Sequence, residues 1–297
     1  MAYKTPDQIA VAAAATGDKK AHLSTGKMLV GGFLAGAYIA FAGLLAVVVT
    51  AGLDPAIWGG VTTLLTGAVF SLGLILVIVG GAELLTGNMA LVPMAVLRKR
   101  VTLGRLGVNW GVVLVANLIG SLFVAYVLAV HTGVIGTASS PAGAAHSAYE
   151  RLGAIATGKA ITEDDGTVFL RAIGCNWLVC LGVWMAMAAE DIGGKVAAIF
   201  FPITAFVALG FDHVVANMFF LPAALFAGVP GIGWGDILRN WVFAGLGNAV
   251  GGTVFVGLAY WYLFLRGSDA GSDGTGHEGG APAATSDGSG TAGAPRG

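Results

Sequence analysis

Three ionisable side chains stand inside otherwise uncharged stretches of the sequence, where they could bind or move a charge. They are Glu83, Asp212 and His213. A charge at bilayer depth costs at least ~2.5 kcal/mol, so such groups usually face a functional interior. Because imidazole changes charge near neutral pH, His213 is the first candidate for binding an anion or passing a proton to it. The alternative is a neutral histidine that hydrogen-bonds the backbone of a helix break.

The two carboxylates occupy matching places in an internal repeat. The segment Gly81-x-Glu83-x4-Asn88-Met89-x3-Pro93 recurs as Gly210-x-Asp212-x4-Asn217-Met218-x3-Pro222, and Asn109-Trp110-x6-Asn117-x2-Gly120 recurs as Asn240-Trp241-x6-Asn248-x2-Gly251. The repeat predicts that residues 29–130 and 166–266 are two copies of one unit.

The repeated polar residues have expected roles at helix breaks. We expect Glu83 and Asp212 to accept hydrogen bonds from backbone N–H groups that a break frees. Asparagines inside membrane helices usually hydrogen-bond across helices, and Asn248 is placed to orient the imidazole of His213. The other members of this asparagine set are Asn88, Asn117 and Asn217. Small residues that let helices approach closely are Gly36, Gly120, Gly251 and Gly252.

The composition is that of an integral membrane protein. Of 297 residues 56% are hydrophobic and 10% are charged, against roughly 25% charged in soluble domains. A net charge of −1 marks no nucleic-acid surface. Cys175 and Cys180 fit neither a metal pair nor a disulfide scaffold. The sequence shows no grouping of nucleophile, base and orienting residue, so we expect neither an enzyme nor a bound cofactor or metal.

Charge-poor runs of about 20 residues predict six membrane crossings. The runs are Met28–Leu53, Pro55–Ala82, Leu106–Val130, Ala172–Ala189, Val196–Phe211 continued by Val214–Ala227, and Asn240–Leu265. The second run continues as Leu84–Leu97 beyond Glu83, and Asp212-His213 cuts the fifth. Spans two and five are therefore predicted to be broken.

A repeat of three spans has a topological consequence. Because three is odd, the second copy enters from the opposite side, which gives the 3+3 inverted repeat found in transporters. Irregular backbone at bilayer depth is tolerated only where protein covers it or where it lines a cavity. The N-termini of half-helices favour a small anion. The sequence thus predicts an all-α membrane protein with a transport pathway between two breaks.

The charge distribution orients the chain. Most Lys and Arg lie on one side of the predicted spans, and the positive-inside rule then places both termini in the cytoplasm. We therefore expect a multi-pass protein of the cell membrane, that is, an inner or plasma membrane. No cleavable signal peptide is visible in residues 1–27. The predicted organisation is a cytoplasmic N-terminal segment with a short surface helix at 1–28, a channel domain at 29–266 and a disordered cytoplasmic tail at 267–297.

Three segments, in the same order, resemble the formate/nitrite transporter family of monovalent-anion channels. They are Ile78–Gly87, Ala172–Gly182 and Gly210–Met218, and the resemblance covers residues 5–266. It implies an aquaporin-like protomer, assembled in the lipid bilayer as a homopentamer with a pore in each protomer. It also implies a small weak-acid anion as substrate, formate first and nitrite or hydrosulfide as alternatives, moved passively or together with protons.

The resemblance also implies roles for individual residues. His213 faces Thr86 on the loop that breaks helix two, with Asn248, Asp212 and Glu83 supporting the central site. Polar positions that attract or guide the anion in a vestibule are Lys159 and Asn176. The matching positions of two apolar constrictions are Phe70, Leu74, Leu84, Leu85 and Phe206. Leu85 stands where family members often carry Phe, and Asp212 replaces a common Glu.

Two functions of other classes compete with anion transport. A neutral-solute channel of the aquaporin type would carry Asn-Pro-Ala at both breaks, whereas this chain has Asn88-Met89-Ala90 and Asn217-Met218-Phe219. A membrane anchor subunit of an enzyme complex would need paired histidines as haem ligands, and His213 is alone among the predicted spans. A bare anion in an apolar ring is costly, so we expect anion transport to depend on pH.

Overall fold

The structure is a computed structural model that describes residues 3–267; residues 268–297, on which most of the predicted tail falls, lie outside the described part. In residues 3–267 the chain forms helices, and the only β-type pairing there is an isolated bridge between Tyr3 and Ala189. The α-helices are α1 (Pro6–Ala21), α2 (Thr25–Thr50), α3 (Pro55–Trp58), α4 (Gly60–Gly80), α5 (Leu85–Leu97), α6 (Leu103–Phe123), α7 (Ala144–Thr157), α8 (Asp165–Ala188), α9 (Ile192–Ala208), α10 (Val214–Phe226), α11 (Trp234–Gly252) and α12 (Ala259–Phe264). Wider π-helical turns follow three of them: η1 (Val124–Val130), η2 (Gly158–Thr162) and η3 (Thr253–Leu258).

Five helices of the described part are long and apolar enough to cross a membrane. They are Thr25–Thr50, Gly60–Gly80, Leu103–Val130, Asp165–Ala188 and Trp234–Phe264. The shorter apolar helices are Leu85–Leu97, Ile192–Ala208 and Val214–Phe226. The predicted all-helical membrane class is confirmed, while the count of six spans stays a prediction.

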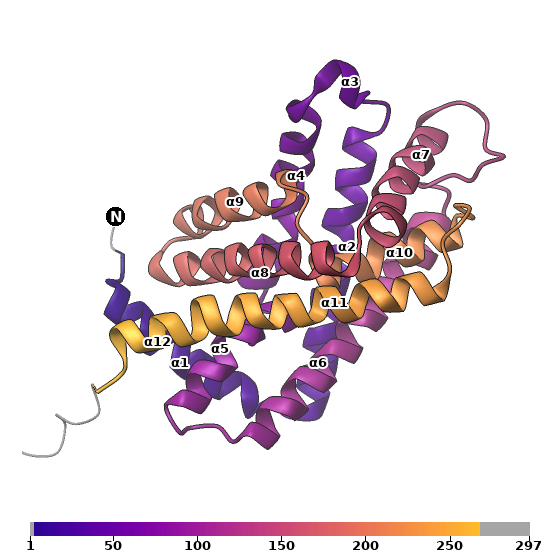
Figure 1. Ribbon diagram of the computed structural model, residues 1–297. Coiled ribbons are helices and arrows are strands. Elements are labelled where there is room, and N and C mark those ends of the chain that lie inside the picture. Colours follow the sequence, from indigo (N-terminus) through magenta and orange to yellow (C-terminus); the bar gives the residue numbers. More distant parts are fainter. Residues whose placement is uncertain (1–2, 268–297) are drawn as a thin grey trace, which may run out of the picture. The chain divides into compact units, whose positions relative to one another are not determined.

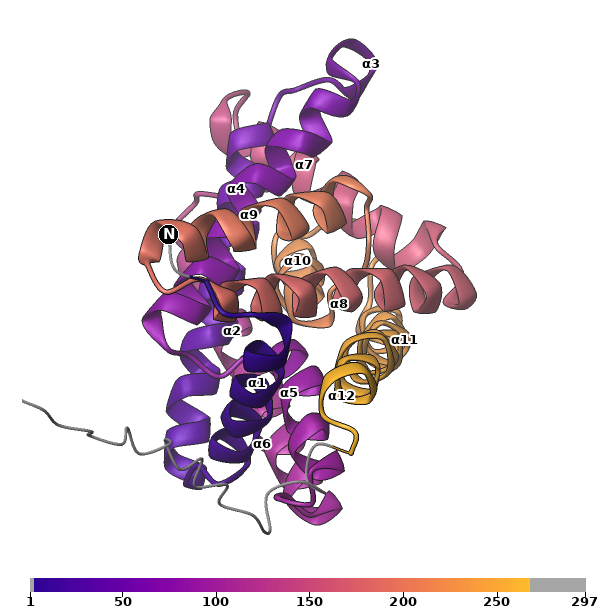
Figure 2. The ribbon, with the colours of Figure 1, turned by 90° about the vertical axis from the view of Figure 1, so that its left-hand side faces the viewer.

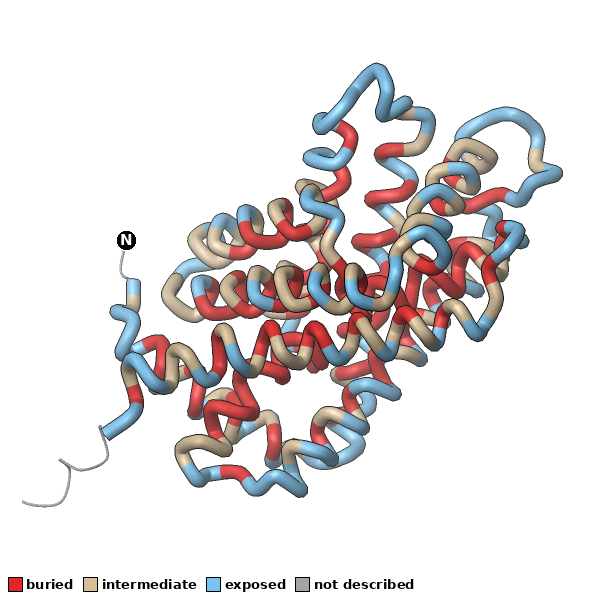
Figure 3. The backbone as a smooth tube through the Cα atoms, viewed as in Figure 1, coloured by how far each residue is buried: buried red, intermediate tan, exposed pale blue. Residues whose placement is uncertain are grey.

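The helix ends near Glu83 and Asp212 follow from glycine. Gly81 follows α4 with φ of 79°, and Gly210 lies between α9 and α10 with φ of 72°. This left-handed conformation costs glycine nothing and most other residues about 1–2 kcal/mol. The chain then turns into α5 and α10, which are each 13 residues long. Both short helices are buried over nearly their whole length (Figure 3).

The two halves of the chain pack in the same order. In the first half α2 packs against both α4 and α6, and in the second half α8 packs against both α9 and α11. Figures 1 and 2 show α8 lying between α9 and α11. The halves meet where α4 packs against α9, where α5 contacts η3 and where α10 contacts η1. Each short helix therefore packs against the other half of the chain.

Glycines let the long helices approach closely, as the sequence predicts. A Cβ on Gly36 would lie 2.0 Å from the carbonyl oxygen of Asn117, and one on Gly120 would lie 2.0 Å from that of Phe33. In the second half a Cβ on Gly251 would lie 2.3 Å from the carbonyl oxygen of Ile173. The predicted close-approach role of these glycines is confirmed.

We expect Gly120→Ala to lower the free energy of unfolding by about 3 kcal/mol, because two helix backbones would have to separate. Gly111→Ala is the matched control, since it lies on the same helix and its Cβ would meet nothing within 4 Å. That control should raise stability by up to about 1 kcal/mol, as Ala for Gly does in a helix. Thermal unfolding of both variants in detergent measures the difference. Equal midpoints would contradict the close approach of α2 and α6.

Candidate functional site

His213 and Thr86 meet where the two short helices begin. His213 is the N-cap residue of α10 and is 2% exposed, and Thr86 lies in the first turn of α5 and is fully buried. The His213 Nδ1 accepts from the backbone N–H of Ala216 at 3.1 Å, and Nε2 lies 2.9 Å from the Thr86 hydroxyl oxygen. Since Nδ1 accepts, the proton of the neutral ring is assigned to Nε2, which donates to Thr86. Two positive helix ends therefore meet at this contact.

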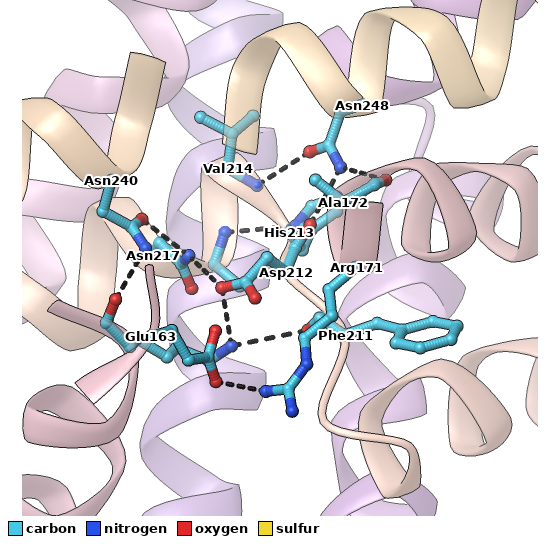
Figure 4. Close-up of polar contacts among 12 residues, drawn as sticks. Glu163, Arg171, Ala172, Phe211, Asp212, His213, Val214, Asn217, Asn240 and Asn248 are labelled. Atoms are coloured by element: carbon cyan, nitrogen blue, oxygen red, sulfur yellow. Dashed lines mark hydrogen bonds and ion pairs between the residues drawn. The ribbon is translucent and has the colours of Figure 1, made fainter. Parts of the chain in front are cut away.

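Asn248 holds the chain on both sides of His213 (Figure 4). Its side-chain nitrogen donates to the carbonyl oxygens of Asp212 and Ala172, each at 2.8 Å. Its side-chain oxygen accepts from the backbone N–H of Val214 at 2.8 Å. Asn248 thus acts on the backbone around the imidazole, where the sequence analysis expects it to orient the ring itself.

Asn117 makes the same three contacts in the first half. It donates to the carbonyl oxygens of Glu83 at 2.9 Å and Gly32 at 2.8 Å, and it accepts from the backbone N–H of Leu85 at 3.0 Å. The residue that corresponds to His213 in this copy is Leu84. The repeat thus builds two equivalent connections, between α4 and α5 and between α9 and α10, and only the second carries a histidine.

The carboxylates of Glu83 and Asp212 do not take the role that the sequence predicts. Asp212 Oδ1 accepts from Lys159 Nζ at 2.8 Å and from the Asn217 amide at 2.9 Å. Glu83 accepts from Lys20 Nζ at 2.9 Å and from the Asn88 amide at 3.2 Å. The freed backbone groups go to Asn117 and Asn248 instead, because an amide can serve both a carbonyl and an N–H, whereas a carboxylate only accepts.

A further asparagine closes each network. Asn109 accepts from Asn88 at 3.0 Å and donates to the carbonyl oxygen of Lys20 at 3.1 Å. In the second half Asn240 accepts from Asn217 at 2.9 Å and donates to the carbonyl oxygen of Lys159 at 3.1 Å. Each half therefore contains the same ring of lysine, carboxylate and two asparagines. Pairing with a lysine and hydrogen bonds from an asparagine lower the cost of burying each carboxylate.

Four cavities form a row past His213. At one end is a cavity of about 900 Å³, the Lys20 vestibule, whose lining includes Lys20, Glu83 and Lys195. At the other end is one of about 250 Å³, the Lys159 vestibule, whose lining includes Lys159, Glu163 and Arg171. Between them lie two voids of about 20 and 10 Å³.

An apolar ring separates the two vestibules. Leu74 and Leu84 line both small voids. Phe70, Phe206 and His213 line the smaller void and also the Lys159 vestibule. A water needs about 10–15 Å³ of accessible space, so each void has room for about one water. In this conformation a hydrated anion cannot pass, and an anion would have to shed water at the ring.

Four residues that the sequence analysis expects at the pathway lie beside the cavities and do not line them. The amide nitrogen of Asn176, expected in a vestibule, donates to the carbonyl oxygens of Thr86 at 3.2 Å and Asn248 at 2.7 Å. None of Thr86, Asn176, Asn248 and Leu85 lines any of the four cavities in this row. Leu85 is 3% exposed and is anchored through its backbone by Asn117. Asn176 thus binds the backbone next to the contact between His213 and Thr86, and Leu85 is buried beside Thr86.

Several charged groups meet around the Lys159 vestibule. Arg171 donates to Glu163, and burial raises the pKa of Glu163 to about 7, with repulsion by Asp212 adding to the shift and Lys159 and Arg171 opposing it. Sequence reasoning missed both Glu163 and Arg171, which lie outside the repeated motifs. Within residues 3–267 no three His, Cys, Asp or Glu side chains come together as a metal site.

Comparisons with known proteins agree with this architecture. Residues 7–262 match the family model described as Formate/nitrite transporter. The uncharacterized transporter YrhG of Bacillus subtilis (strain 168) is 47% identical over 90% of this chain and 96% of its own length. A probable formate transporter of Methanothermobacter thermautotrophicus is 46% identical over 89% and 98%. The formate channel BtFdhC of Bacillus thuringiensis is 42% identical over 90% and 98%.

Solved structures give the same result. An FNT family ion channel superimposes with a TM-score of 0.77 at 31% identity, over 86% of this chain and 98% of that one. A pentameric formate channel with formate bound superimposes with a TM-score of 0.70 at 31% identity, over 81% and 98%.

Proposed function

The chain belongs to the formate/nitrite transporter family, and on that premise we propose that it moves formate across a membrane along the row of cavities past His213. The assignment confirms the resemblance found in the sequence, and it makes the protein a membrane transporter or channel and not an enzyme. Anion transport is thereby favoured over a neutral-solute channel and over a membrane anchor subunit.

The observation that carries the proposal is the apolar ring with one polar contact at its centre. Phe70, Leu74, Leu84 and Phe206 strip water from the anion, and the contact between His213 and Thr86 offers hydrogen bonds where water is lost. The N-termini of α5 and α10 add a positive potential at the same place. Lys20 and Lys159 raise the anion concentration at the two entrances.

A proton accompanies the anion at the ring. An unpaired anion in an apolar environment is costly, and conversion to the neutral acid removes most of that cost. His213 takes part by donating from Nε2 to the substrate oxygen in place of Thr86 Oγ1, 2.9 Å away. The protonated imidazolium is the alternative partner, but it would lose the Nδ1 lone pair that accepts from Ala216.

Formate is the proposed substrate and nitrite the alternative. Two of the relatives described above carry formate in their names, and the family description includes both anions. The proposed assembly is a homopentamer with one path in each protomer, which is supported by the pentameric formate channel. The lysines that precede α2 support cytoplasmic termini.

Tracer exchange in proteoliposomes tests the proposal. With equal pH and equal formate on both sides, the purified protein should exchange labelled formate far faster than protein-free liposomes, and unlabelled nitrite should compete. Glycerol permeability should stay at the background value, because a glycerol molecule has to keep its hydrogen-bonding groups satisfied within an apolar ring. Formate exchange at the background rate would reject formate transport, and fast glycerol permeation would then favour a neutral-solute channel.

A further inference from the structure

Two buried carboxylate oxygens beside the Lys159 vestibule lack a hydrogen-bond donor within the described part of the chain. They are Oδ2 of Asp212 and Oε2 of Glu163. Asp212 is fully buried, and its other oxygen accepts from Lys159 and Asn217. The other oxygen of Glu163 accepts from Arg171. Each carboxylate is thus satisfied by a cation on one side only, although buried polar atoms are nearly always paired.

The two carboxyl groups lie near each other. Figure 4 shows the Glu163 carboxylate next to that of Asp212, and repulsion by the Asp212 charge contributes to the raised pKa of Glu163. Two ionised carboxylates can only accept, so they cannot satisfy one another. One proton turns one of them into a donor, which satisfies both oxygens and removes the repulsion.

We infer that Glu163 and Asp212 form a proton-binding site in which one proton from solvent sits on Glu163 Oε2 and is donated to Asp212 Oδ2. Glu163 is the proton carrier because the Asp212 carboxylate is already paired with Lys159 at 2.8 Å and accepts from the Asn217 amide. Glu163 also lines the vestibule and can exchange its proton with solvent there. Its pKa of about 7 agrees with this assignment.

Other charged or titratable groups surround the pair on every neighbouring element. They are Lys159 on η2, Arg151 on α7, Asp165, Arg171 and Cys175 on α8, Arg239 on α11, and His213. Arg239 and Asp165 pair with each other at 3.5 Å. The remaining cations are Lys159, Arg151 and Arg171. Together with ionised Glu163 and Asp212 they give a net charge of +1, and the shared proton raises this net charge to +2.

Proton binding therefore regulates the entrance. Glu163 is protonated below about pH 7 and ionised above it. As pH falls, the Lys159 vestibule gains one positive charge and attracts anions more strongly. This inference rests on the proposed function, because it assigns a pH response to the entrance of the same path. It concerns the charge of the vestibule and is separate from the protonation of the anion at the apolar ring.

Glu163→Gln tests the site, because glutamine donates to Asp212 as a protonated glutamate does. In tracer formate exchange at equal pH on both sides and low formate, the variant should be about fivefold faster than wild type at about pH 8 and equal to it at about pH 6. The matched control is Glu150→Gln, since the side chain of Glu150 is 66% exposed and pairs with His146 on its own helix. This control should follow wild type at both pH values.

The inference would be overturned if the exchange rate of Glu163→Gln, divided by that of wild type, were the same at both pH values. That result would leave formate transport intact. Should wild type itself show no formate exchange, the proposed function fails, and infrared titration then tests the proton site alone. The absorption of a protonated carboxyl should appear as pH falls through about 7 in wild type and in Glu150→Gln and be missing in Glu163→Gln. No carboxyl titrating between about pH 6 and about pH 8 in wild type would also overturn it.

Discussion

Replacing His213 by asparagine is expected to slow formate exchange by about tenfold at neutral pH, because a substrate oxygen left without a donor inside the apolar ring costs about 1–3 kcal/mol. Asparagine caps a helix well, so α10 should still begin at Val214. Its shorter side chain cannot reach both the Ala216 N–H and the Thr86 hydroxyl, which the imidazole contacts at 3.1 and 2.9 Å. The variant thus removes the central donor and leaves the fold.

The measurement is tracer exchange of formate over a range of pH, with nitrite as competitor. His131→Asn is the matched control, since His131 is exposed at the end of η1 and lines none of the four cavities. It should leave rate, pH dependence and competition unchanged. If His213→Asn behaved in the same way, the imidazole would have no part in transport.

Local backbone signals made much of the architecture predictable. A long apolar run predicts a helix because lipid offers no hydrogen bonds, so the backbone groups of the run must bond to one another. Gly81 and Gly210, each followed two residues later by an acid, mark the places where α4 and α9 have ended. Both features depend on residues that are close together in the chain, so a single sequence is enough to predict them.

Partners that are distant in the chain could not be read in the same way. Lys20 pairs with Glu83 across 63 residues, whereas Lys159 pairs with Asp212 across 53. Because the two separations differ, the repeat gives no constant spacing that would reveal Lys20. The useful signal would have been a lysine in the segment that precedes each copy.

The sequence also did not reveal that asparagines, and not the carboxylates, bind the freed backbone groups. The spacing places Glu83 near the freed backbone groups, but only packing shows that the Asn117 amide reaches them from α6. Glu163 and Arg171 lack a counterpart in the first motif and were missed for that reason. Only the folded structure shows that one oxygen of Glu163 is buried without a hydrogen-bond donor near Asp212.

Closing the apolar ring tests whether the anion uses this path. Leu84 is 3% exposed and lines both small voids, of about 20 and 10 Å³. An indole is far larger than these voids, so Leu84→Trp should fill them, at a cost in stability of about 1–3 kcal/mol from overpacking. Leu84→Phe adds less volume and should give an intermediate rate. The matched control is Leu114→Trp on α6, which is 38% exposed and lines none of the four cavities.

Formate exchange by Leu84→Trp, measured on protein that remains monodisperse and shows a cooperative thermal transition, is the most direct single measurement. The rate should fall to that of protein-free liposomes, while Leu114→Trp exchanges formate at the wild-type rate. Wild-type exchange by folded Leu84→Trp would mean that the anion crosses elsewhere, and the pathway past His213 would be wrong.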